Sequence, residues 1–483
     1  MRMRRGLRQR DVASAVGITE HQIRKWERGL ATPPRGVFEA LAELFGVPWV
    51  ELAGAQHAYS AEVEAGEGYT TARVRQSAVQ GPSIDEPLGD GLRVLDLYCG
   101  AGGLAFGLEL TGGFRTVAGL DLLPDRVSTF RLNHPHATGL VADIREFPPE
   151  QLRAVSRGVD VVVGGPPCQG FSSIRPFRTL TEGDKRNSLL EDFVLVVSSL
   201  KPRWVVFENV VGILTHLGGK VLASLLEGFE SCGYSVTWRV LNASLYGVPQ
   251  NRERLFVVGN RVGANFEWPE PSHRNDYKSM AGSRREVIRT DDLFSQHLPE
   301  SVTVIEAIGD LPAVRSGESK RSYGSLPANA FQAWVRRSAS ELTLHGATRH
   351  SKHMLEIIKH SGPNISSIPK GLIRSGFSSS YSRLDPDDPS TTLTVNFVHP
   401  ASNRCIHPYQ DRALTPREGA RLQSFPDTFQ FAGTRAQIVK QIGNAVPPLL
   451  ARSVGMAILA AENGSMIKSE SAQDVASPSA VAV

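Results

Sequence analysis

Between residues 92 and 260, short apolar runs alternate with stretches whose apolar residues have helical spacing. The apolar runs are LRVLDLY, RTVAGLD, GLVADI, VDVVVGG, RWVVFENV, SVTWRVL and RLFVVGN, and helical stretches such as LAFGLELT and SLLEDFVLVVSSL separate several of them. This alternation predicts a parallel, doubly wound α/β sheet, because helices that link parallel strands cover both faces of the sheet. Residues 261–410 lack the alternation and are rich in loops, so we expect a smaller second domain there.

The length of 483 residues favours two or three domains, and 41% hydrophobic with 21% charged residues is ordinary for a globular protein. The four cysteines form no close C-x-x-C pair; they are Cys99, Cys168, Cys232 and Cys405. We therefore expect no disulfide framework and no zinc or other metal site, which fits a reducing cytosol. The basic start MRMRRGLRQRD precedes no apolar signal region, and no apolar run is long enough to span a bilayer, so we expect no membrane association.

The net charge of +4 is unevenly distributed along the chain. Residues 1–35 contain nine Arg or Lys and three acidic residues, and residues 311–383 contain eleven Arg or Lys and three acidic residues. A single basic stretch is more often solvated surface than a binding site. Two such stretches on a nearly balanced chain favour a polyanionic partner such as DNA.

Residues 1–54 have a helical pattern. A short amphipathic helix over Gln9–Val16 is followed by a turn at Gly17, and Thr19 is a good N-cap for a second helix that ends before Gly29. Two helices joined by a tight turn are the helix-turn-helix unit, in which the second helix reads DNA. Its candidate contacts to bases or phosphates are His21, Gln22, Arg24 and Lys25.

This segment resembles the Cro and lambda-repressor type of helix-turn-helix domain through LRQRDVASAVGITEHQIRKWERGLATP and LAELFGV. Only six residues precede the motif, so either the first helix of that family is abbreviated or the true start lies upstream of Met1. A small helical docking module is the alternative interpretation. Residues 55–90 have no periodicity and predict a linker, and residues 463–483 predict a disordered tail of low complexity.

A glycine-rich turn follows the first apolar run, in DLYCGAGGLAFG. Gly100, Gly102 and Gly103 allow a tight turn into a helix, and Asp121 ends the next run about twenty residues later, where a carboxylate can bind ribose hydroxyls. Asp143, after the third run, is placed to bond an adenine amino group. The pattern suits S-adenosylmethionine or a nicotinamide dinucleotide, although the absence of G-x-G-x-x-G disfavours the dinucleotide.

Two reactive side chains follow later strands of the predicted sheet. Cys168 lies in GGPPCQGFS after the fourth run, where the two prolines exclude a helix interior, and Glu208 ends the fifth run in FENV. Ligands of open α/β sheets bind beyond the carboxyl ends of the strands, so both side chains should face the nucleotide crevice. Each alone has a plain alternative: an inert buried cysteine, or a glutamate that caps a helix.

Six blocks, in order, resemble the DNA (cytosine-5)-methyltransferase family: DLYCGAGG, GGPPCQGFS, FENV, YGVPQNRERLFVVG, RALTPREGARLQSFPD and QIGNAVPPLLA. The likeness covers residues 92–460. It implies a Rossmann-like, S-adenosylmethionine-dependent catalytic domain over residues 91–260, a target-recognition domain over 261–410, and a C-terminal part of the catalytic domain over 411–462. Two departures conserve the chemistry: Tyr98 stands where phenylalanine is usual, and Asp121 where glutamate is usual.

The resemblance implies roles for single residues. Cys168 would be the nucleophile that adds to carbon 6 of cytosine, and Glu208 the acid near ring nitrogen 3. Arg252 and Arg254 would both lie at the active site, with Arg252 nearest the ring and the nucleophile. The cytosine would be flipped out of the duplex, and the loop SSIRPFRTLTEGDKRN, which begins at Ser172, would close over it and contact DNA.

The resemblance also implies a site for S-adenosylmethionine. Its residues would be Tyr98, Gly100, Gly103, Asp121, Leu122, Asp143, Ile144, Leu189 and Asn444, with Pro167 supporting the cysteine loop. The stretch TLTV, residues 392–395, either contacts the target strand through Thr392 or is a plain β-strand.

Together these features predict a prokaryotic modification methylase that acts on double-stranded DNA as a monomer in the cytoplasm, associated with the nucleoid. Its N-terminal head would bind operator DNA near its own gene. The alternatives are an RNA cytosine-5 methyltransferase, a DNA-binding regulator with an inactive methyltransferase domain, and, resting on the glycine turn alone, a dehydrogenase.

Overall fold

The computed structural model describes residues 9–20, 22–23, 40–41, 44, 91–147, 149–156, 158–167, 188–278, 287–288, 297–373 and 375–475. The chain divides into two compact units, Met1–Gln80 and Gly81–Val483. The predicted linker over residues 55–90 lies outside the described residues and stays a prediction.

The first unit contains the expected beginning of a helix-turn-helix. Helix α1 (Gln9–Ala15) is followed by a turn in which Gly17 has a φ of 70°, and the Gln22 amide N–H donates to Thr19 Oγ1 at 3.3 Å. The Gln22 side chain in turn accepts a hydrogen bond from the Thr19 amide at 3.0 Å. The predicted turn and N-cap are therefore confirmed. His21, Arg24 and Lys25 lie outside the described residues.

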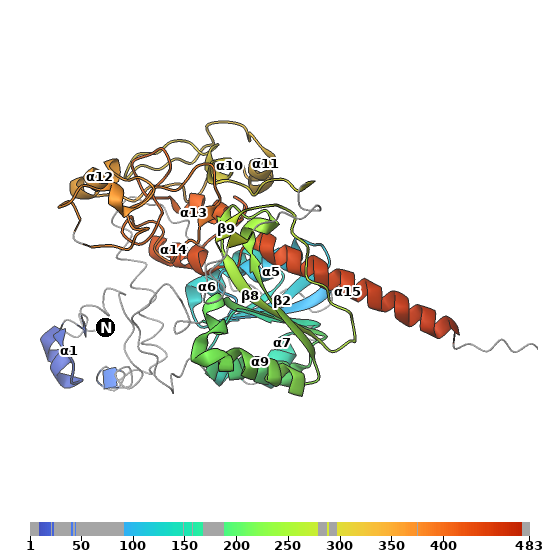
Figure 1. Ribbon diagram of the computed structural model, residues 1–483. Coiled ribbons are helices and arrows are strands. Elements are labelled where there is room, and N and C mark those ends of the chain that lie inside the picture. Colours follow the sequence, from blue (N-terminus) through green and yellow to red (C-terminus); the bar gives the residue numbers. More distant parts are fainter. Residues whose placement is uncertain are drawn as a thin grey trace, which may run out of the picture. The chain divides into compact units, whose positions relative to one another are not determined.

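A seven-stranded sheet forms the centre of the second unit, in the order β3-β2-β1-β4-β5-β8-β6. Strands β2 and β8 of this sheet are labelled in Figure 1. Its strands are β1 (Leu92–Leu97), β2 (Phe114–Asp121), β3 (Thr138–Val141), β4 (Val161–Gly164), β5 (Trp204–Val210), β6 (Ser235–Asn242) and β8 (Glu253–Asn260). All seven predicted strands are confirmed.

The sheet is mixed, which corrects the prediction of a parallel one. The first five strands in chain order pair in parallel, but β8 runs antiparallel to both β5 and β6. Only residues 243–252 connect β6 to β8, and a parallel crossover requires a dozen or more residues, so the chain must reverse direction there.

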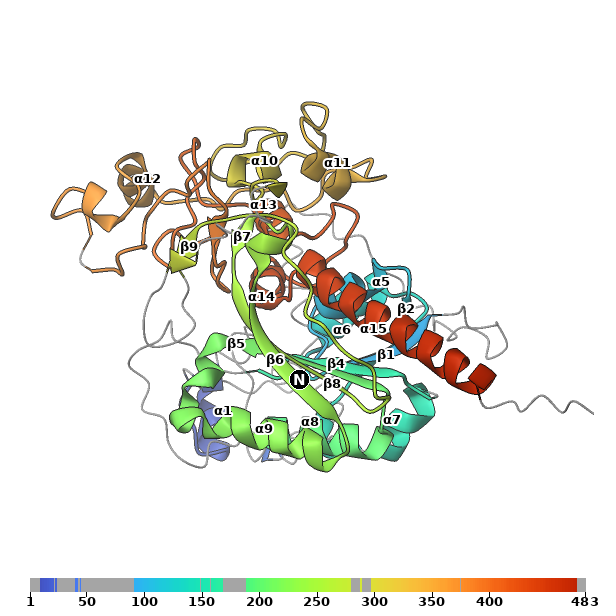
Figure 2. The same cartoon turned by 45° about the vertical axis from the view of Figure 1, so that its right-hand side comes forward.

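Helices cover both faces of the sheet, as Figure 2 shows. Alternate residues of the central strands point to opposite faces: Val94, Val161 and Val206 pack with α5 (Gly103–Glu109) and α15 (Pro448–Val475). Leu95, Val162 and Val205 pack on the other face with α7 (Pro149–Ser156), α8 (Ser188–Leu200) and α9 (Lys220–Ser231). Helix α6 (Pro124–Asn133) lies against β2 and β3. The doubly wound prediction is therefore confirmed.

The segment between residues 261 and 410 is mostly loop, with short helices α10 (Val304–Ile308), α11 (Ala330–Arg336) and α12 (Lys352–Lys359). Paired two-residue strands are β9 (Tyr277–Lys278) with β10 (Val287–Ile288), and β7 (Gln250–Asn251) with β11 (Ser390–Thr391). Many of its apolar residues, such as Val304, Leu342 and Leu393, share one cluster with α13 (Pro416–Leu422) and α14 (Arg435–Asn444) of the returning chain. In the described chain, residues 261–410, which we call the recognition segment after their predicted role, therefore pack in part on the last part of the chain.

Helix α15 ends at Val475 and so includes the first thirteen residues of the predicted tail, 463–475. Residues 463–475 contain no proline, and apart from Gly464 nothing in their sequence stops a helix, which explains the difference. In the described chain, residues 435–464 alone are long and apolar enough to cross a membrane, and 56% of their apolar window is buried inside the fold. A core helix of a water-soluble protein has the same properties.

Candidate active site

Three predicted site residues, and Gly165 on the backbone that leads to Cys168, come from the carboxyl ends of neighbouring strands. Tyr98 follows β1, Asp121 ends β2, Gly165 follows β4, and Glu208 lies near the end of β5. Because β1, β2, β4 and β5 are parallel neighbours, these residues lie along one edge of the sheet. The structure therefore brings together the predicted nucleotide side and the predicted catalytic side.

Asp121 organises the glycine-rich turn. The amide N–H of Gly100 donates to Asp121 Oδ2 at 3.0 Å, and that of Leu123 donates to Oδ1 at 2.9 Å. Gly100 has a φ of 53° and Gly102 a φ of 86°, left-handed conformations that favour glycine. Asp121 is 3% exposed, and Arg126 Nη1 lies 3.6 Å from its Oδ2. Two carboxylate oxygens offer about four lone pairs, so Asp121 can both hold the turn and accept a hydrogen bond from a ligand.

Gly103 allows a second close approach at this turn. A Cβ there would lie 2.5 Å from the carbonyl oxygen of Val446, so only glycine admits the returning chain. Tyr98 has a left-handed φ of 56°, and its hydroxyl donates to the carbonyl oxygen of Leu189 at 2.9 Å. Two predicted cofactor residues from distant parts of the sequence are thereby tied together.

Asp143 and Ile144 begin the 3-10 helix Ile144–Glu146 after β3. The Asp143 carboxylate accepts hydrogen bonds from the Arg145 amide and guanidinium, and the Arg145 guanidinium lowers the pKa of that carboxyl. Asp143 is therefore ionised at neutral pH and can accept a hydrogen bond from an amino group. Ile144 is 6% exposed, whereas Leu122 offers an apolar side chain that is 57% exposed beside Asp121.

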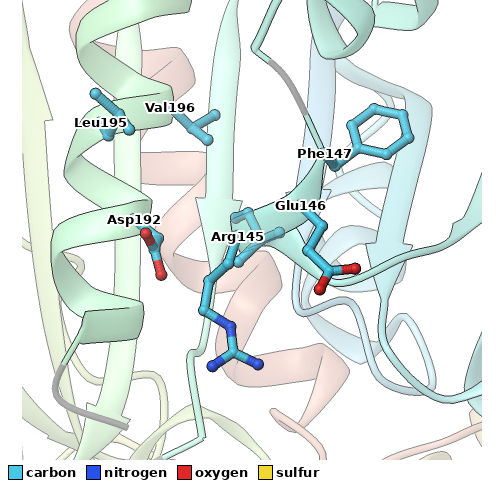
Figure 3. A pocket seen from close by; sticks show the side chains of 7 residues that line it. Arg145, Glu146, Phe147, Asp192, Leu195 and Val196 are labelled. Carbon is cyan, nitrogen blue, oxygen red and sulfur yellow. The ribbon is translucent and has the colours of Figure 1, made fainter. Parts of the chain in front are cut away.

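A pocket of about 160 Å³, shown in Figure 3, is lined in part by Arg145, the residue whose guanidinium donates to Asp143. Arg145 and Phe147 come from the segment after β3, and Asp192 and Val196 come from α8. The buried Oδ2 of Asp192 has no hydrogen-bond partner among the described residues. The pocket thus contains an acceptor that a ligand donor could satisfy, and neither Arg145 nor Asp192 was predicted from the sequence.

Glu208 forms the charged centre of the catalytic side. Its Oε1 pairs with Arg254 Nε at 3.0 Å, and the residue is 9% exposed. Burial raises the pKa of the Glu208 carboxyl and outweighs the lowering by Arg254 and Arg252. This carboxyl therefore holds a proton more readily than an ordinary glutamate.

The backbone that leads toward Cys168 lies against this carboxyl. A Cβ at Gly165 would come within 2.9 Å of Glu208 Oε2, and Asn209 Nδ2 donates to the carbonyl oxygen of Pro166 at 3.4 Å. Cys168 and Ser172 lie outside the described residues, and Pro167, the last described residue before them, is exposed. The predicted approach of the cysteine loop to Glu208 is consistent with these contacts.

Arg252 and Arg254 differ in their surroundings. Arg254 reaches Glu208, whereas the Arg252 guanidinium donates to the carbonyl oxygens of Leu393, Gly443 and Ala445. The prediction that Arg252 lies nearest the ring and the nucleophile stays untested. Its backbone contacts could not be predicted because those partners lie 141 to 193 residues away in sequence.

The last two predicted residues lie at segment ends. Asn444 is exposed at the end of α14. Thr392 follows β11, and its hydroxyl donates to the carbonyl oxygen of Asn251 at 2.8 Å. The interpretation of residues 392–395 as a plain strand is wrong, since β11 ends at Thr391 and the next residues are irregular. In the described chain, no group of three or more His, Cys, Asp or Glu residues could hold a metal ion.

Comparisons with known proteins agree with this geometry. Residues 92–460 match the family model of C-5 cytosine-specific DNA methylases, and residues 1–54 match that of a helix-turn-helix domain. The chain is 36% identical over 374 residues to Type II methyltransferase M1.HphI of Haemophilus parahaemolyticus, covering 76% of this chain and 87% of that relative. It is 32% identical over 435 residues to Type II methyltransferase M.AgeI of Thalassovita gelatinovora, covering 76% and 99%.

Among solved structures, an E. coli protein described as a prophage-encoded DNA modification methyltransferase superposes with a TM-score of 0.60 at 24% identity. That alignment covers 77% of this chain and 100% of the E. coli chain, and it shows a shared fold. The match over residues 92–460 and the 36% identity to M1.HphI show that this chain belongs to the C-5 cytosine-specific DNA methylase family and is a DNA cytosine-5 methyltransferase with an N-terminal helix-turn-helix domain.

Proposed function

We propose that this enzyme transfers a methyl group from S-adenosylmethionine to carbon 5 of a flipped-out cytosine in one short sequence of double-stranded DNA. The observation that carries the proposal is the buried Glu208–Arg254 pair, against which the backbone leading to Cys168 lies. Relatives named as Type II methyltransferases support a role as the modification enzyme of a restriction-modification system. It would act as a monomer in the bacterial cytoplasm, on the DNA of the nucleoid.

Carbon 5 of cytosine is a weak nucleophile. Addition of the Cys168 thiolate to carbon 6 makes the ring enamine-like, so that carbon 5 can attack an electrophilic methyl group. Glu208 supports this step because a proton shared with ring nitrogen 3 neutralises the charge that the addition places on the ring. Arg254 occupies Oε1, so Oε2 is the oxygen left to share that proton.

S-adenosylmethionine supplies the methyl group as an electrophile. After carbon 5 carries the methyl group, it loses its proton to a base, and the electron pair of that bond expels the Cys168 thiolate from carbon 6. The product is 5-methylcytosine, and the nucleophile is restored. The target base cannot be reached inside a duplex, so it must be extruded into the crevice.

The residues at the glycine-rich turn fit a nucleoside ligand. Asp121 would accept hydrogen bonds from ribose hydroxyls, Asp143 would accept one from the adenine amino group, and exposed Leu122 would pack on the adenine ring. Asp192 adds a buried oxygen without a partner among the described residues. The remaining candidates for this site are Tyr98, Gly100, Gly103, Ile144, Pro167, Leu189 and Asn444.

DNA would be held by the recognition segment and by the loop after the cysteine. The exposed basic residues of the recognition segment supply phosphate affinity; they are Arg315, Lys320, Arg321, Arg337, Arg349, Lys352, Lys359 and Lys370. Arg336, counted in this basic stretch from sequence, is instead buried and paired with Asp310 at 2.9 Å. Ser172 and Thr392 stay proposed DNA contacts.

Bisulfite sequencing tests the activity in cells that lack cytosine methylation of their own and express this chain. We expect protected cytosines at one recurring short sequence, and full conversion in cells that express Cys168→Ser. Complete conversion with soluble wild-type protein would overturn the proposal. Methylation of transfer RNA but not of duplex DNA would show that the substrate is RNA.

We propose further that the helix-turn-helix head binds operator DNA near its own gene and restrains expression, with His21, Gln22, Arg24 and Lys25 as contacts. The match of residues 1–54 to a helix-turn-helix family supports this role. A reporter fused to the gene's own promoter should rise when residues 1–54 are deleted, while methylation persists. An unchanged reporter would contradict the regulatory role.

A further inference from the structure

Arg252, two residues before Arg254 on the connection from β6 to β8, is the centre of a buried hydrogen-bond network. We call this network the arginine hub, and it consists of Arg252, Gln250, Leu393, Gly443 and Ala445. Arg252 is 1% exposed and Gln250 is fully buried. Buried polar groups are normally paired, and both terminal nitrogens of Arg252 are, whereas its buried Nε has no partner among the described residues. The contacts of the two terminal nitrogens indicate what Arg252 positions.

One nitrogen of Arg252 holds the backbone on both sides of Asn444. Nη2 donates to the carbonyl oxygen of Gly443 at 3.0 Å and to that of Ala445 at 3.1 Å. The first of these carbonyls belongs to the last turn of α14, and the second follows its end. The guanidinium therefore determines where the exposed Asn444 side chain is presented.

The other nitrogen holds the segment on the DNA side. Nη1 donates to the carbonyl oxygen of Leu393 at 3.2 Å, and the Leu393 amide donates to Gln250 Oε1 at 3.0 Å. The Gln250 side chain also donates to Leu422 and Gln423. Leu393 directly follows Thr392, so the hub also determines the course of the segment proposed to meet the target strand.

The two segments held by Arg252 also touch each other. A Cβ at Gly443 would lie 2.5 Å from the carbonyl oxygen of Thr394, a separation that side-chain carbons do not adopt. Gly443 is therefore required for the close packing of residues 393–395 against residues 443–445. A displacement of either segment must move the other.

We propose that Arg252 is a positioning residue that couples the cofactor side of the site to the target-strand side, while Arg254 makes the direct ion pair with Glu208. The inference rests on the proposed function, since it takes Asn444 to contact S-adenosylmethionine. Arg252 and Arg254, which the sequence resemblance places together at the active site, thus have different roles. A guanidinium that contacted only the target cytosine would not affect cofactor binding without DNA, whereas Arg252 should.

The test is calorimetric titration of S-adenosylmethionine into the full chain without DNA. We compare wild type, Arg252→Met and Arg252→Lys, which keeps the charge but cannot reach all the carbonyls, with Arg254→Met. Misplacement of Asn444 should weaken binding about tenfold or more in both Arg252 variants, since small displacements of positioned groups are costly. Arg254→Met should bind within about twofold of wild type, because the ion pair and the hydrogen bond of Arg254 are with Glu208 and Glu253, which are not part of the hub.

A second pair of variants tests the contact between residues 393–395 and residues 443–445 without removing a charge. Gly443→Ala forces residues 443 and 394 apart and should also weaken binding. Gly324→Ala is the matched control, because a Cβ at that exposed glycine meets only ordinary contacts, at 3.6 Å or more, and binding should not change. Hydrogen exchange at residues 443–446 should be faster in Gly443→Ala and in Arg252→Met.

The outcomes are distinguishable. A variant that is merely unstable would show fewer binding sites with an unchanged dissociation constant, whereas mispositioning raises the dissociation constant at one site per chain. Arg252 variants that bind like wild type while turnover falls would overturn the inference and make Arg252 a contact of the base. Wild-type protein that fails to bind S-adenosylmethionine would contradict the proposed function instead.

Discussion

At the scale of single residues, burial and neighbouring charges give chemically similar side chains of the site different pKa values. Glu208 and Asp143 are both carboxyls, but burial raises the pKa of the first and Arg145 lowers the pKa of the second. The first therefore keeps its proton to a higher pH than an ordinary glutamate, while the second stays an acceptor. The sequence shows two acids, and only their surroundings assign them different chemistry.

Replacement of Glu208 by glutamine should lower turnover by about 100-fold or more, as expected for loss of a general acid. In wild type, turnover should decline as the pH rises through the raised pKa of Glu208, because the carboxyl then loses its proton. The variant should lack this alkaline decline. A pH profile of single-turnover rates checks the prediction, and an identical alkaline limb in both proteins would contradict it.

The same raised pKa has a consequence for stability. A carboxyl that binds its proton more tightly when folded stabilises the protein below its unfolded pKa, and that contribution is lost as the pH rises through the folded pKa. Glu208→Gln should therefore gain stability relative to wild type as the pH increases. Thermal unfolding of both proteins across the pH range gives the difference, and one that does not grow with pH would disprove the linkage.

Replacement of Asp121 by asparagine should weaken S-adenosylmethionine binding by about tenfold or more, since an amide accepts through one oxygen while two backbone N–H groups require acceptors. Titration calorimetry measures the effect. Glu150→Gln, an exposed change on α7, is the control and should bind as wild type does. Equal affinities for Asp121→Asn and wild type would show that the turn does not depend on this carboxylate.

At the scale of elements, strand positions could be predicted from sequence, whereas the direction of β8 could be predicted only partly. Each strand is a local apolar run, and α8 occupies the thirteen residues that its pattern predicts. The reversal between β6 and β8 depends on a connection too short for a crossover, a signal that was available but weaker than the alternation. The packing of α13 against α10 has no local signal, because the two helices are separated by all of residues 309–415.

Helix α5 contains a glycine at which close packing and helix propensity predict opposite effects of an alanine on stability. A Cβ at Gly107 would lie 2.4 Å from the carbonyl oxygen of Pro448, so Gly107→Ala should lower the free energy of unfolding by about 1–3 kcal/mol despite the better helix propensity of alanine. Gly464→Ala, in α15 with nothing within 4 Å, is the matched control and should cause no loss. Urea unfolding measures both, and equal stabilities would contradict the close packing of α5 on α15.

At the scale of the whole molecule, buried ion pairs join the recognition segment to the returning chain. Arg421 pairs with both Asp310 and Asp427, and all three residues are buried. Arg417 lies 3.6 Å from Asp427 and donates to the carbonyl oxygen of Thr343. Removing one partner from such a network leaves a buried charge uncompensated, so the two parts of the second unit should depend on each other for stability.

Asp427→Asn should therefore lower the free energy of unfolding by about 3–5 kcal/mol. Asp411 forms an ion pair with Arg383, and its side chain is 54% exposed. Asp411→Asn should therefore lower the free energy of unfolding by less than about 1 kcal/mol. Denaturant unfolding of the two variants gives the comparison. Similar losses in both would mean that the buried network does not join the segments energetically.

The sequence alone determined the order of the strands along the chain, the glycine turn, the acids at strand ends and the helix-turn-helix signal, because each depends on neighbours within a few residues. The tertiary structure decided which of these groups meet: Arg254 with Glu208, Asp121 with the Gly100 amide, and Arg252 with segments on either side of the site. Such contacts join residues 21 to 193 positions apart, where a pattern along the chain carries no distance information. The two arginines of QNRER cannot be distinguished from the sequence, because the contacts that make them different form only in the folded chain.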